Sequence, residues 1–514
     1  MIRIGVDVGG TNTDAVILDG TSVIGGTKSP TSPDILSGAK TAIKNALEQS
    51  GVSIDKIDAV MVGTTHFVNA IVQRKTLAKT GLIRLCLPSG SSLPPFTVWP
   101  QDLRDAMGCD YELVQGGYEM TGAEIAPFDE DATVQAAGRL RDKGYRQIAL
   151  SAVFSTVRGD MEQRAAEAIE NAYPDLSVTK SLDIGRIGLL ERENAGVLNA
   201  SLKPLAQDVV DAFKNMQRVL GLRCPMYFTR NDGTLIATDE VSKLPVLTFA
   251  CGPTNSMRGA AFLANLKDAL VVDVGGTTTD VGELQMGFPR QAGISVTVAD
   301  VQTNFAMPDI ISVGLGGGTI IDVQSGKVGP DSVGHRLLQD SMVFGGDTLT
   351  ASDIAVAAGR AQMGNKNPPN LPNTEALLAK IDAIAADVVA RSRTSGADLP
   401  VITVGGGSVL LADRIDGLKV VRPEHYDLAN AVGAAIAQVS GDVSKIVTLG
   451  PELDRDTAIG NVTQEAREIA IKRGASQESL SILSVSDIPL AYLPGENLAV
   501  SVTVVGDLQR EIVE

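Results

Sequence analysis

Two stretches of the sequence follow one pattern: VDVGGTNTD at residues 6–14 and VDVGGTTTD at residues 272–280. An apolar run precedes each stretch, so Asp7 and Asp273 are expected where a β-strand ends and a turn begins. Paired glycines let such a turn bring backbone N–H groups close to an oxyanion. A carboxylate at the strand end can hold a hydrated divalent cation against polyphosphate oxygens. Two such turns, each opening one half of the chain, predict a duplicated fold that clamps a nucleoside triphosphate between its halves.

The composition favours an α/β enzyme. Hydrophobic residues make up 44% of the 514 positions and aromatic residues only 4%, so aliphatic side chains must fill the cores, as in buried parallel sheets. The net charge of −17, without a basic run, argues against nucleic acid or an anionic membrane as a partner. No apolar stretch reaches the ~20 residues of a membrane span, and a strand expected directly after Met1 leaves no room for a signal peptide. Because the four cysteines are also scattered, without C-x-x-C spacing, we expect reduced thiols and a cytoplasmic location.

Short β-branched runs alternate with Ala-rich amphipathic segments along the chain, which predicts an α/β fold. We expect an N-terminal half at residues 1–180, a second half at residues 181–440 and a small α+β domain at residues 441–514. Within the first half, residues 89–128 combine Ser, Gly and Pro with little periodicity. An irregular insertion is therefore expected there.

Three further segments extend the pattern of a nucleotide cleft. Residues 400–410 (PVITVGGGSVL) read as a buried strand that runs into three glycines, on which a flat base and ribose can lie. Residues 430–437 (NAVGAAIA) predict a small-residue helix that can cross a similar helix closely, and residues 63–70 are its expected counterpart in the first half. This order of segments is typical of actin-like, ribonuclease H-like ATPases and of sugar kinases.

Over roughly residues 1–440 the chain resembles the A-type, ATP-binding subunit of the hydantoinase/oxoprolinase family. The matching segments are residues 7–14, 63–70, 192–204 (RENAGVLNASLKP), 273–281, 312–320 (SVGLGGGTI), 328–334 and 348–355. The resemblance implies an actin-like ATPase fold and ATP-dependent hydrolysis of a cyclic amide, such as a hydantoin or 5-oxoproline, through phosphorylation of the lactam carbonyl oxygen. It also implies ATP with Mg²⁺ or Mn²⁺, and a separate B-type or other partner subunit in an oligomeric assembly.

The candidate site residues come from these segments. Asp7 and Asp273 are the expected catalytic residues, facing each other and positioning Mg²⁺ on the β- and γ-phosphates. Donors to phosphate, and backbone contacts to the nucleoside, are expected from the two turns and two glycine-rich segments: Gly9, Gly10, Thr11, Asn12, Thr13, Gly275, Gly276, Thr277, Thr278, Gly316, Gly317, Gly405, Gly406 and Gly407. His66 is a further candidate for a metal or substrate contact, although a hydrogen-bonded helix residue is the commoner role for such a histidine.

Three alternatives stay open at the level of sequence. Residues 314–318 can bind phosphate or simply pass close to the second turn. Asn231-Asp232 resembles the base-bearing pair of sugar kinases, and a small-molecule kinase would need Asp232 or another acid as its base, although a turn is the commoner role for this dipeptide. A non-metabolic actin-like ATPase is the remaining class.

Overall fold

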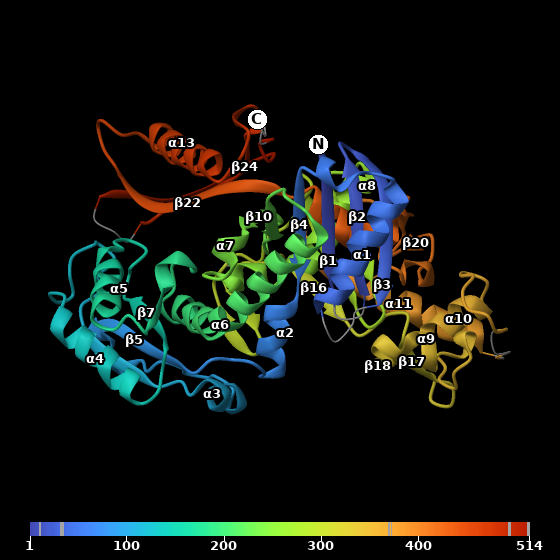
Figure 1. Cartoon of the computed structure of the whole chain (residues 1–514), viewed down its shortest axis with the longest axis horizontal. Helices are drawn as coiled ribbons and strands as arrows, with labels where there is room; N and C mark the ends of the chain where they lie inside the picture. Colours follow the sequence, from blue (N-terminus) through green and yellow to red (C-terminus); the bar gives the residue numbers. More distant parts are fainter. Residues whose placement is uncertain are drawn as a thin grey trace.

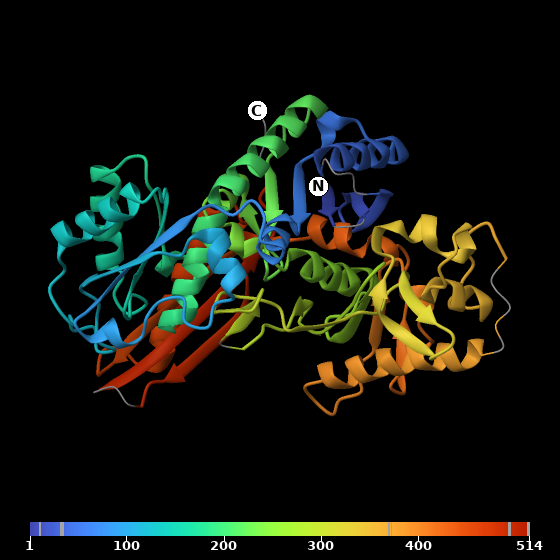
Figure 2. The same cartoon turned by 90° about the horizontal axis from the view of Figure 1, so that it is seen from below.

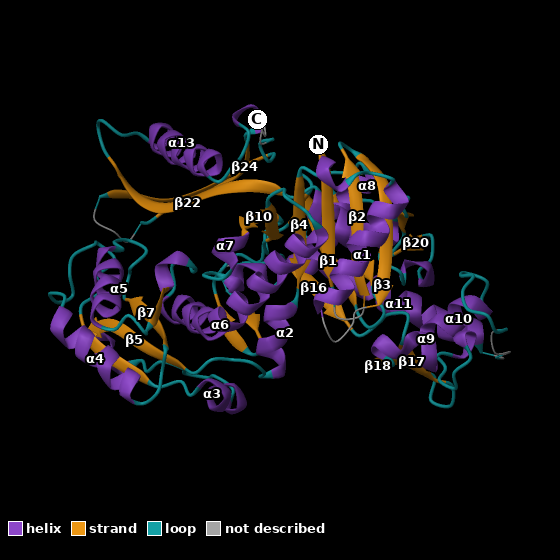
Figure 3. Ribbon diagram, in the orientation of Figure 1, coloured by secondary structure: helices purple, strands orange, loops and turns teal. Residues whose placement is uncertain are grey.

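The computed structural model describes residues 1–9, 12–30, 35–293, 295–367, 371, 373–491 and 495–510. These residues form a mixed α/β structure whose main framework is three sheets with helices packed against them (Figures 1 and 3). We call residues 9–13 the first glycine turn and residues 275–279 the second glycine turn. Gly10 and Thr11 lie outside the described residues. None of the helices that the structure describes combines the length and apolar character needed to cross a bilayer.

The largest sheet carries the first glycine turn. In spatial order its strands are β23 (Ser481–Pro489), β24 (Glu496–Gly506), β22 (Gln438–Leu449), β10 (Thr234–Ala237), β9 (Met226–Thr229), β4 (Ala59–Thr64), β1 (Ile2–Val8), β2 (Asn12–Asp19) and β3 (Ser22–Pro30). Strand β1 pairs antiparallel with β2 and parallel with β4. Helix α1 (Ile35–Ser50) packs on one face of β2, against Ala15 and Ile17, and α12 (Ala429–Ala435) packs on the other face, against Val16 and Leu18. This strict alternation follows from side chains pointing to opposite faces along a strand.

The second sheet repeats this local arrangement around the second glycine turn. Its strands are β13 (Phe288–Pro289), β12 (Thr279–Gln285), β11 (Ala269–Val274), β19 (Val401–Val404), β21 (Leu418–Val421) and β20 (Arg414–Ile415), with β16 (Ile310–Val313) paired to β12. Strand β11 pairs antiparallel with β12 and parallel with β19, as β1 does with β2 and β4. Helix α11 (Thr374–Ser392) covers one face and α8 (Cys251–Ala264) the other.

The third sheet is parallel and corrects the expectation of an irregular insertion. Its strands are β6 (Tyr111–Gln115), β5 (Thr80–Leu87), β7 (Gln147–Ala152) and β8 (Ser177–Lys180), with α4 (Glu130–Asp142) and α5 (Asp160–Ala172) packed against them. Residues 89–128 therefore contain an edge strand, β6, and a short helix, α3 (Gln101–Met107). Both elements are too short to show periodicity. Phe96 and Trp99, which precede α3, are buried in the same apolar cluster as the residues of β1 and α6.

Helix α6 (Leu189–Leu220) joins the third sheet to the rest of the molecule and runs diagonally between them in Figure 2. At its start, Glu193 makes a fully buried two-bond ion pair with Arg84 of β5, at 2.6 Å (Nε–Oε2) and 2.5 Å (Nη2–Oε1). Asn194 accepts a hydrogen bond from the Trp99 indole at 2.9 Å and donates one to the Gln302 carbonyl at 2.9 Å. The RENAGVLNASLKP segment is thus a structural junction.

Sheet membership crosses the domain boundaries expected from the sequence. Strands β9 and β10, which follow residue 180, join the same sheet as β1, and the boundary near residue 440 falls inside β22. Helix α13 (Arg455–Lys472) covers β22 and β24, so residues 441–510 extend the largest sheet. The division of the chain into domains at residues 1–180, 181–440 and 441–514 stays a prediction.

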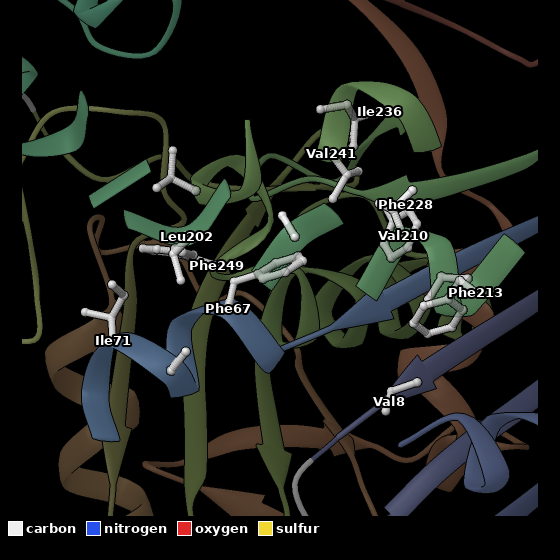
Figure 4. Close-up of a cluster of buried hydrophobic side chains, with 14 of the residues drawn as sticks. Val8, Phe67, Ile71, Leu202, Val210, Phe213, Phe228, Ile236, Val241 and Phe249 are labelled. Carbon is white, nitrogen blue, oxygen red and sulfur yellow. The ribbon is translucent and has the colours of Figure 1, made fainter. Parts of the chain in front are cut away.

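The remaining short elements lie mostly beside the second sheet and α6. They are α2 (His66–Gln73), α7 (Thr238–Val241), β14 (Val296–Val298), β15 (Val301–Thr303), β17 (Thr319–Asp322), β18 (Lys327–Ser332), α9 (Leu337–Asp340) and α10 (Ala351–Ala357). Around the end of β1, Val8 belongs to the same buried cluster as Phe67, Phe213 and Phe228 (Figure 4). Phe213 and Phe228 meet edge to face at 5.4 Å. A closely packed apolar cluster therefore supports the end of the strand that leads into the first glycine turn.

Helices α8 and α12 cross at the junction of the first two sheets. A Cβ atom at Gly259 would lie 1.9 Å from the Ala429 carbonyl oxygen, and one at Gly433 would lie 1.8 Å from the Asn255 carbonyl oxygen. Only glycine permits this approach, which confirms the close crossing expected for residues 430–437. Residues 63–70, the expected counterpart of this segment in the first half, form the end of β4 and the start of α2. The helix that crosses α12 is α8.

Candidate functional site

The two glycine turns are closed by equivalent backbone hydrogen bonds. Gly9 N–H donates to the Asn12 carbonyl at 3.0 Å, and Gly275 N–H donates to the Thr278 carbonyl at 2.9 Å. Across the strands that each turn connects, Asp7 lies opposite Asp14 and Asp273 lies opposite Asp280. Each turn therefore presents a cross-strand pair of carboxylates, and the placement of Asp7 and Asp273 near strand ends agrees with the sequence prediction.

Asp7 is buried beside the crossing helices. It is 6% exposed, and the Asn430 side-chain amide of α12 lies 3.4 Å from its Oδ2. Burial, followed by the charge of Asp14, raises the pKa of Asp7 to about 6, and Asn430 and Asn255 of α8 oppose this rise. The Oδ1 atoms of Asp7 and Asp14 are both buried and have no hydrogen-bond partner among the described residues. These two carboxylate oxygens could accept from a ligand or coordinate a cation.

The aspartates of the second turn interact with those of the first. Burial raises the pKa of Asp273, and it raises the pKa of Asp280 to about 6 although the Ser312 hydroxyl donates to Asp280. The charge of Asp273 contributes to the raised pKa of Asp7 and of Asp14. The four carboxylates consequently share one electrostatic environment between the first two sheets, as the sequence predicted for Asp7 and Asp273.

This carboxylate set fits a hard divalent cation only in part. Unpaired, buried carboxylate oxygens such as Asp7 Oδ1 are the ligands that Mg²⁺ prefers. Among the described residues, however, no group of three His, Cys, Asp or Glu side chains converges as a complete metal site. A cation held here would need oxygens from a bound ligand or water. His66 lies at the start of α2 beside Phe67, and burial lowers its pKa. No described contact supports a metal at His66, and that role stays a prediction.

The second glycine turn leaves backbone donors for a ligand. The N–H groups of Gly276, Thr277 and Thr278 have no acceptor among the described residues, and both threonines are exposed. A Cβ atom at Gly276 would meet no other atom within 4 Å. The turn is thus open at Gly276, and turn amides without an acceptor inside the protein can bind oxyanions.

The loop at residues 314–318 supports the second glycine turn from behind. Gly317 N–H donates to the Gly275 carbonyl at 3.0 Å, and Gly318 N–H donates to the Gly276 carbonyl at 2.7 Å. Gly316 N–H donates to the Thr319 hydroxyl at 2.7 Å. Because these amides are already used inside the protein, the loop packs against the turn, and phosphate contacts from Gly316 and Gly317 are not supported.

The glycines at residues 405–407 have different roles. Gly405 has φ +82°, and a Cβ atom there would lie 2.3 Å from Asp273 Oδ1, so this glycine makes room for the carboxylate. Gly407 packs on Val274, to whose carbonyl its N–H donates at 2.8 Å. A Cβ atom at Gly406 would meet nothing within 4 Å. Gly406 is therefore the position of the three that faces open space and can receive a ligand.

Asn231 and Asp232 form a turn. The Asn231 side chain donates to the Val246 carbonyl and accepts from Ala250 N–H, and it is 2% exposed. Asp232 Oδ1 accepts from both the backbone and the hydroxyl of Thr234, at 3.0 and 2.6 Å. Both side chains are engaged in holding the β9–β10 connection. The base that a kinase mechanism would require is not available in this pair.

Several residues of the site were missed in the sequence. Asn255 and Ser256 are consecutive on α8. Burial raises the pKa of Asp7 and of Asp273, and Asn255 opposes this increase for Asp7 while Ser256 opposes it for Asp273. The Cys251 thiol, at the start of α8, both accepts from Thr64 N–H and donates to the Thr64 carbonyl at 3.2 Å. The small residues Gly252, Gly259, Ala260 and Ala261 could have indicated a close-packed helix, but composition does not reveal which carboxylate a helix meets.

Comparison with known proteins identifies the relatives of this chain. A model of the hydantoinase/oxoprolinase N-terminal region matches residues 3–173, and a model of hydantoinase/oxoprolinase matches residues 192–369. The chain is 28% identical to the acetophenone carboxylase gamma subunit of Aromatoleum aromaticum over 69% of this chain and 53% of that protein. It is 24% identical to the caprolactamase subunit alpha of Pseudomonas jessenii over 90% of this chain and 70% of that protein.

Solved structures show the same fold. The crystal structure of the ATP-dependent caprolactamase from Pseudomonas jessenii superimposes with a TM-score of 0.76 at 19% identity, covering 99% of this chain and 88% of that chain. A nucleotide-free acetone carboxylase structure gives a TM-score of 0.68 at 17% identity, with the same two coverages. The fold and the paired glycine turns define an α/β protein of the type found in these enzymes. The chain belongs to the hydantoinase/oxoprolinase family.

Proposed function

We propose that this chain is the ATP-binding subunit of an enzyme that hydrolyses a cyclic amide at the expense of ATP. The observation that carries the proposal is the pair of equivalent glycine turns, each with two aspartates beside it. Burial raises the pKa of these aspartates, and the charge of Asp273 in the second sheet adds to the increase for Asp7 and Asp14 in the first. Family membership supports the reaction class, since the relatives include a caprolactamase subunit and a 5-oxoprolinase of Pestalotiopsis fici.

The fold that we propose is a duplicated, actin-like ATPase. Its support is the repeated local topology: β1 with β2 and β4, and β11 with β12 and β19, each with an aspartate near the end of the central strand. The crossing of α8 and α12 would then join the two halves, and the nucleotide would lie between the two turns with its base near Gly406.

The residues of this chain have separate tasks in such a reaction. The free N–H groups at residues 276–278 would bind polyphosphate oxygens and stabilise the charge that develops during phosphoryl transfer. Asp7, Asp14 and Asp273 would hold Mg²⁺ through their oxygens and through water. When bound, Mg²⁺ offsets the negative charge of the phosphates. Asn255 and Asn430 would keep Asp7 oriented toward the cleft.

The proposed chemistry makes an unreactive amide susceptible to water. The lactam carbonyl oxygen forms a bond to the γ-phosphorus, the bond to the bridging oxygen breaks, and ADP leaves with that electron pair. After loss of the ring N–H proton the product is an imidate phosphate, whose ring carbon accepts water. The C–N bond then breaks, a second water releases phosphate, and a ring-opened acid, ADP and phosphate result. We further propose a partner subunit that completes the hydrolysis, because relatives of this chain are named as subunits.

ATP turnover by the purified chain tests the proposal, with hydantoin, 5-oxoproline, caprolactam or glucose added in turn. Phosphate release that a cyclic amide stimulates, with a ring-opened product in equal amount, is the expected result once the partner subunit is present. Stimulation by glucose with transfer of phosphate to its hydroxyl would overturn the proposal in favour of a kinase. Full turnover by the chain alone would remove the partner from the account.

A further inference from the structure

Lys28 of β3 is a cation placed among the four aspartates. It lies opposite Asp14 in the β2–β3 register, and its Nζ donates to Asp14 Oδ2 at 2.8 Å. The same Nζ donates to the Asp427 carbonyl at 2.8 Å. Burial raises the pKa of Asp14 in the first sheet and of Asp273 in the second, and the positive charge of Lys28 opposes both increases. The ammonium group of Lys28 thus interacts electrostatically with one aspartate in each of the first two sheets.

The local repeat of the fold shows what is special about this position. Strand β16 stands to β12 as β3 stands to β2, and Ser312 lies opposite Asp280 just as Lys28 lies opposite Asp14. The Ser312 hydroxyl has one proton, which it donates to Asp280. A hydroxyl group is therefore enough to hydrogen-bond Asp280 in the second sheet, whereas the equivalent position in the first sheet carries the long cationic side chain of Lys28.

The amine of Lys28 has capacity beyond its two hydrogen bonds. An ammonium group has three donors, and among the described residues Lys28 uses two of them, on Asp14 and the Asp427 carbonyl. The side chain retains 32% of its surface exposed, whereas Asp14 retains 9%. The third N–H of Lys28 is therefore accessible to a ligand in the cleft.

Lys28 also connects the two sheets through one short loop. The residue before Asp427 is Tyr426, whose carbonyl accepts from Gly405 N–H at 2.9 Å. Gly405 in turn lies against Asp273. The amine is thus fixed relative to both glycine turns and to the open position at Gly406, so its place in the cleft is preorganised.

We propose that Lys28 is a nucleotide-binding residue, which neutralises Asp14 and donates its third N–H to a polyphosphate oxygen of ATP. This inference rests on the proposed function, since it requires the polyphosphate to lie between the glycine turns. A triphosphate in a cleft with four carboxylates needs positive charge besides that of a metal, and Lys28 supplies it without leaving Asp14.

Calorimetric titration of the full chain with MgATP, MgADP and adenosine tests the assignment. The variants are Lys28→Met, Lys28→Arg and, as a matched control, Lys44→Met on the exposed face of α1. Loss of a charged hydrogen bond predicts an affinity about 10- to 100-fold weaker for MgATP in Lys28→Met. Adenosine affinity should not change, Lys28→Arg should recover most of the MgATP affinity, and Lys44→Met should match the wild type.

Two results would overturn the inference alone: unchanged MgATP affinity in Lys28→Met, or an equal loss for adenosine and MgATP, which would mean a merely structural role. A folded wild-type chain that does not bind MgATP would overturn the proposed function as well. Thermal unfolding identifies variants that fail to fold. If Lys28→Met is one of them, Lys28→Gln keeps uncharged N–H donors for Asp14, and the same loss of MgATP affinity is expected.

Discussion

Replacing Asp7 by asparagine should stabilise the nucleotide-free protein while it abolishes ATP turnover. Asp7 is buried, one of its oxygens has no hydrogen-bond partner, and the charges of Asp14 and Asp273 oppose its ionisation. The folded protein therefore holds this carboxyl proton more tightly than the unfolded chain does. An asparagine keeps the shape of the side chain and removes the charge.

The magnitude follows from the raised pKa. The pKa of Asp7 moves from 3.8 to about 6, and each pKa unit corresponds to about 1.4 kcal/mol, so the ionised form costs about 3 kcal/mol. The contribution has a definite sign: the free energy of unfolding falls as pH rises from about 4 to about 6, because the native state then binds more protons than the unfolded state. The free energy of unfolding of Asp7→Asn does not fall in this way, so the variant should be up to about 3 kcal/mol more stable than the wild type above pH 7.

Urea unfolding between pH 4.5 and 8 measures this difference. Trp99, the single tryptophan, is 6% exposed and lies in the same buried cluster as Val8 of β1. Its fluorescence therefore reports on the unfolding of the core that packs against the strand of Asp7. The stability gap should open as pH rises and then level off. A gap that does not vary with pH, or a variant less stable than the wild type at pH 7.5, would refute the reasoning about Asp7.

Three further substitutions test other parts of the account. Gly406→Val should fold normally, since a Cβ atom there meets nothing within 4 Å. It should weaken ATP binding at least tenfold, because the valine side chain would occupy the space proposed for the base of the nucleotide. Wild-type affinity in a titration would place that base elsewhere. Gly433→Ala should lower the free energy of unfolding by about 1–3 kcal/mol or more, because its Cβ would lie 1.8 Å from the Asn255 carbonyl oxygen, and unchanged urea unfolding would contradict the close crossing of α8 and α12. Arg84→Met should lower the free energy of unfolding by about 3–5 kcal/mol, because it leaves Glu193 charged and unpaired in the core. Adding Glu193→Gln should restore much of that loss in the same unfolding assay. No recovery would mean that the loss of stability comes from packing.

The parts of the site that the sequence predicted are those encoded locally. A strand followed by Gly-Gly-Thr places an aspartate near the strand end regardless of the rest of the fold, and both Asp7 and Asp273 lie there. Gly433 in a run of small residues indicated a close helix crossing, which the structure confirms. Such features need only backbone sterics and a short spacing.

The parts that could not be predicted depend on pairing between distant segments. Lys28 meets Asp14 only because β3 pairs with β2 in one particular register, and a shift of one residue would turn its side chain to the other face. The glycines at residues 314–318 had two possible roles until the acceptors of their N–H groups were known. Small residues likewise show that a helix packs closely without showing its partner, so the crossing of α12 with α8 could not be read from residues 430–437 alone.

MgATP binding and hydrolysis by wild-type protein and Asp273→Asn test the central claim most directly, namely that both glycine turns act on one nucleotide. Asp273 lies in the second turn, yet its charge acts on Asp7 and Asp14 of the first. We expect Asp273→Asn to fold and to be at least as stable as the wild type near neutral pH, because burial raises the pKa of Asp273, but to lose metal-dependent ATP hydrolysis. Wild-type hydrolysis by Asp273→Asn would contradict the account, because the second turn would then have only a structural role.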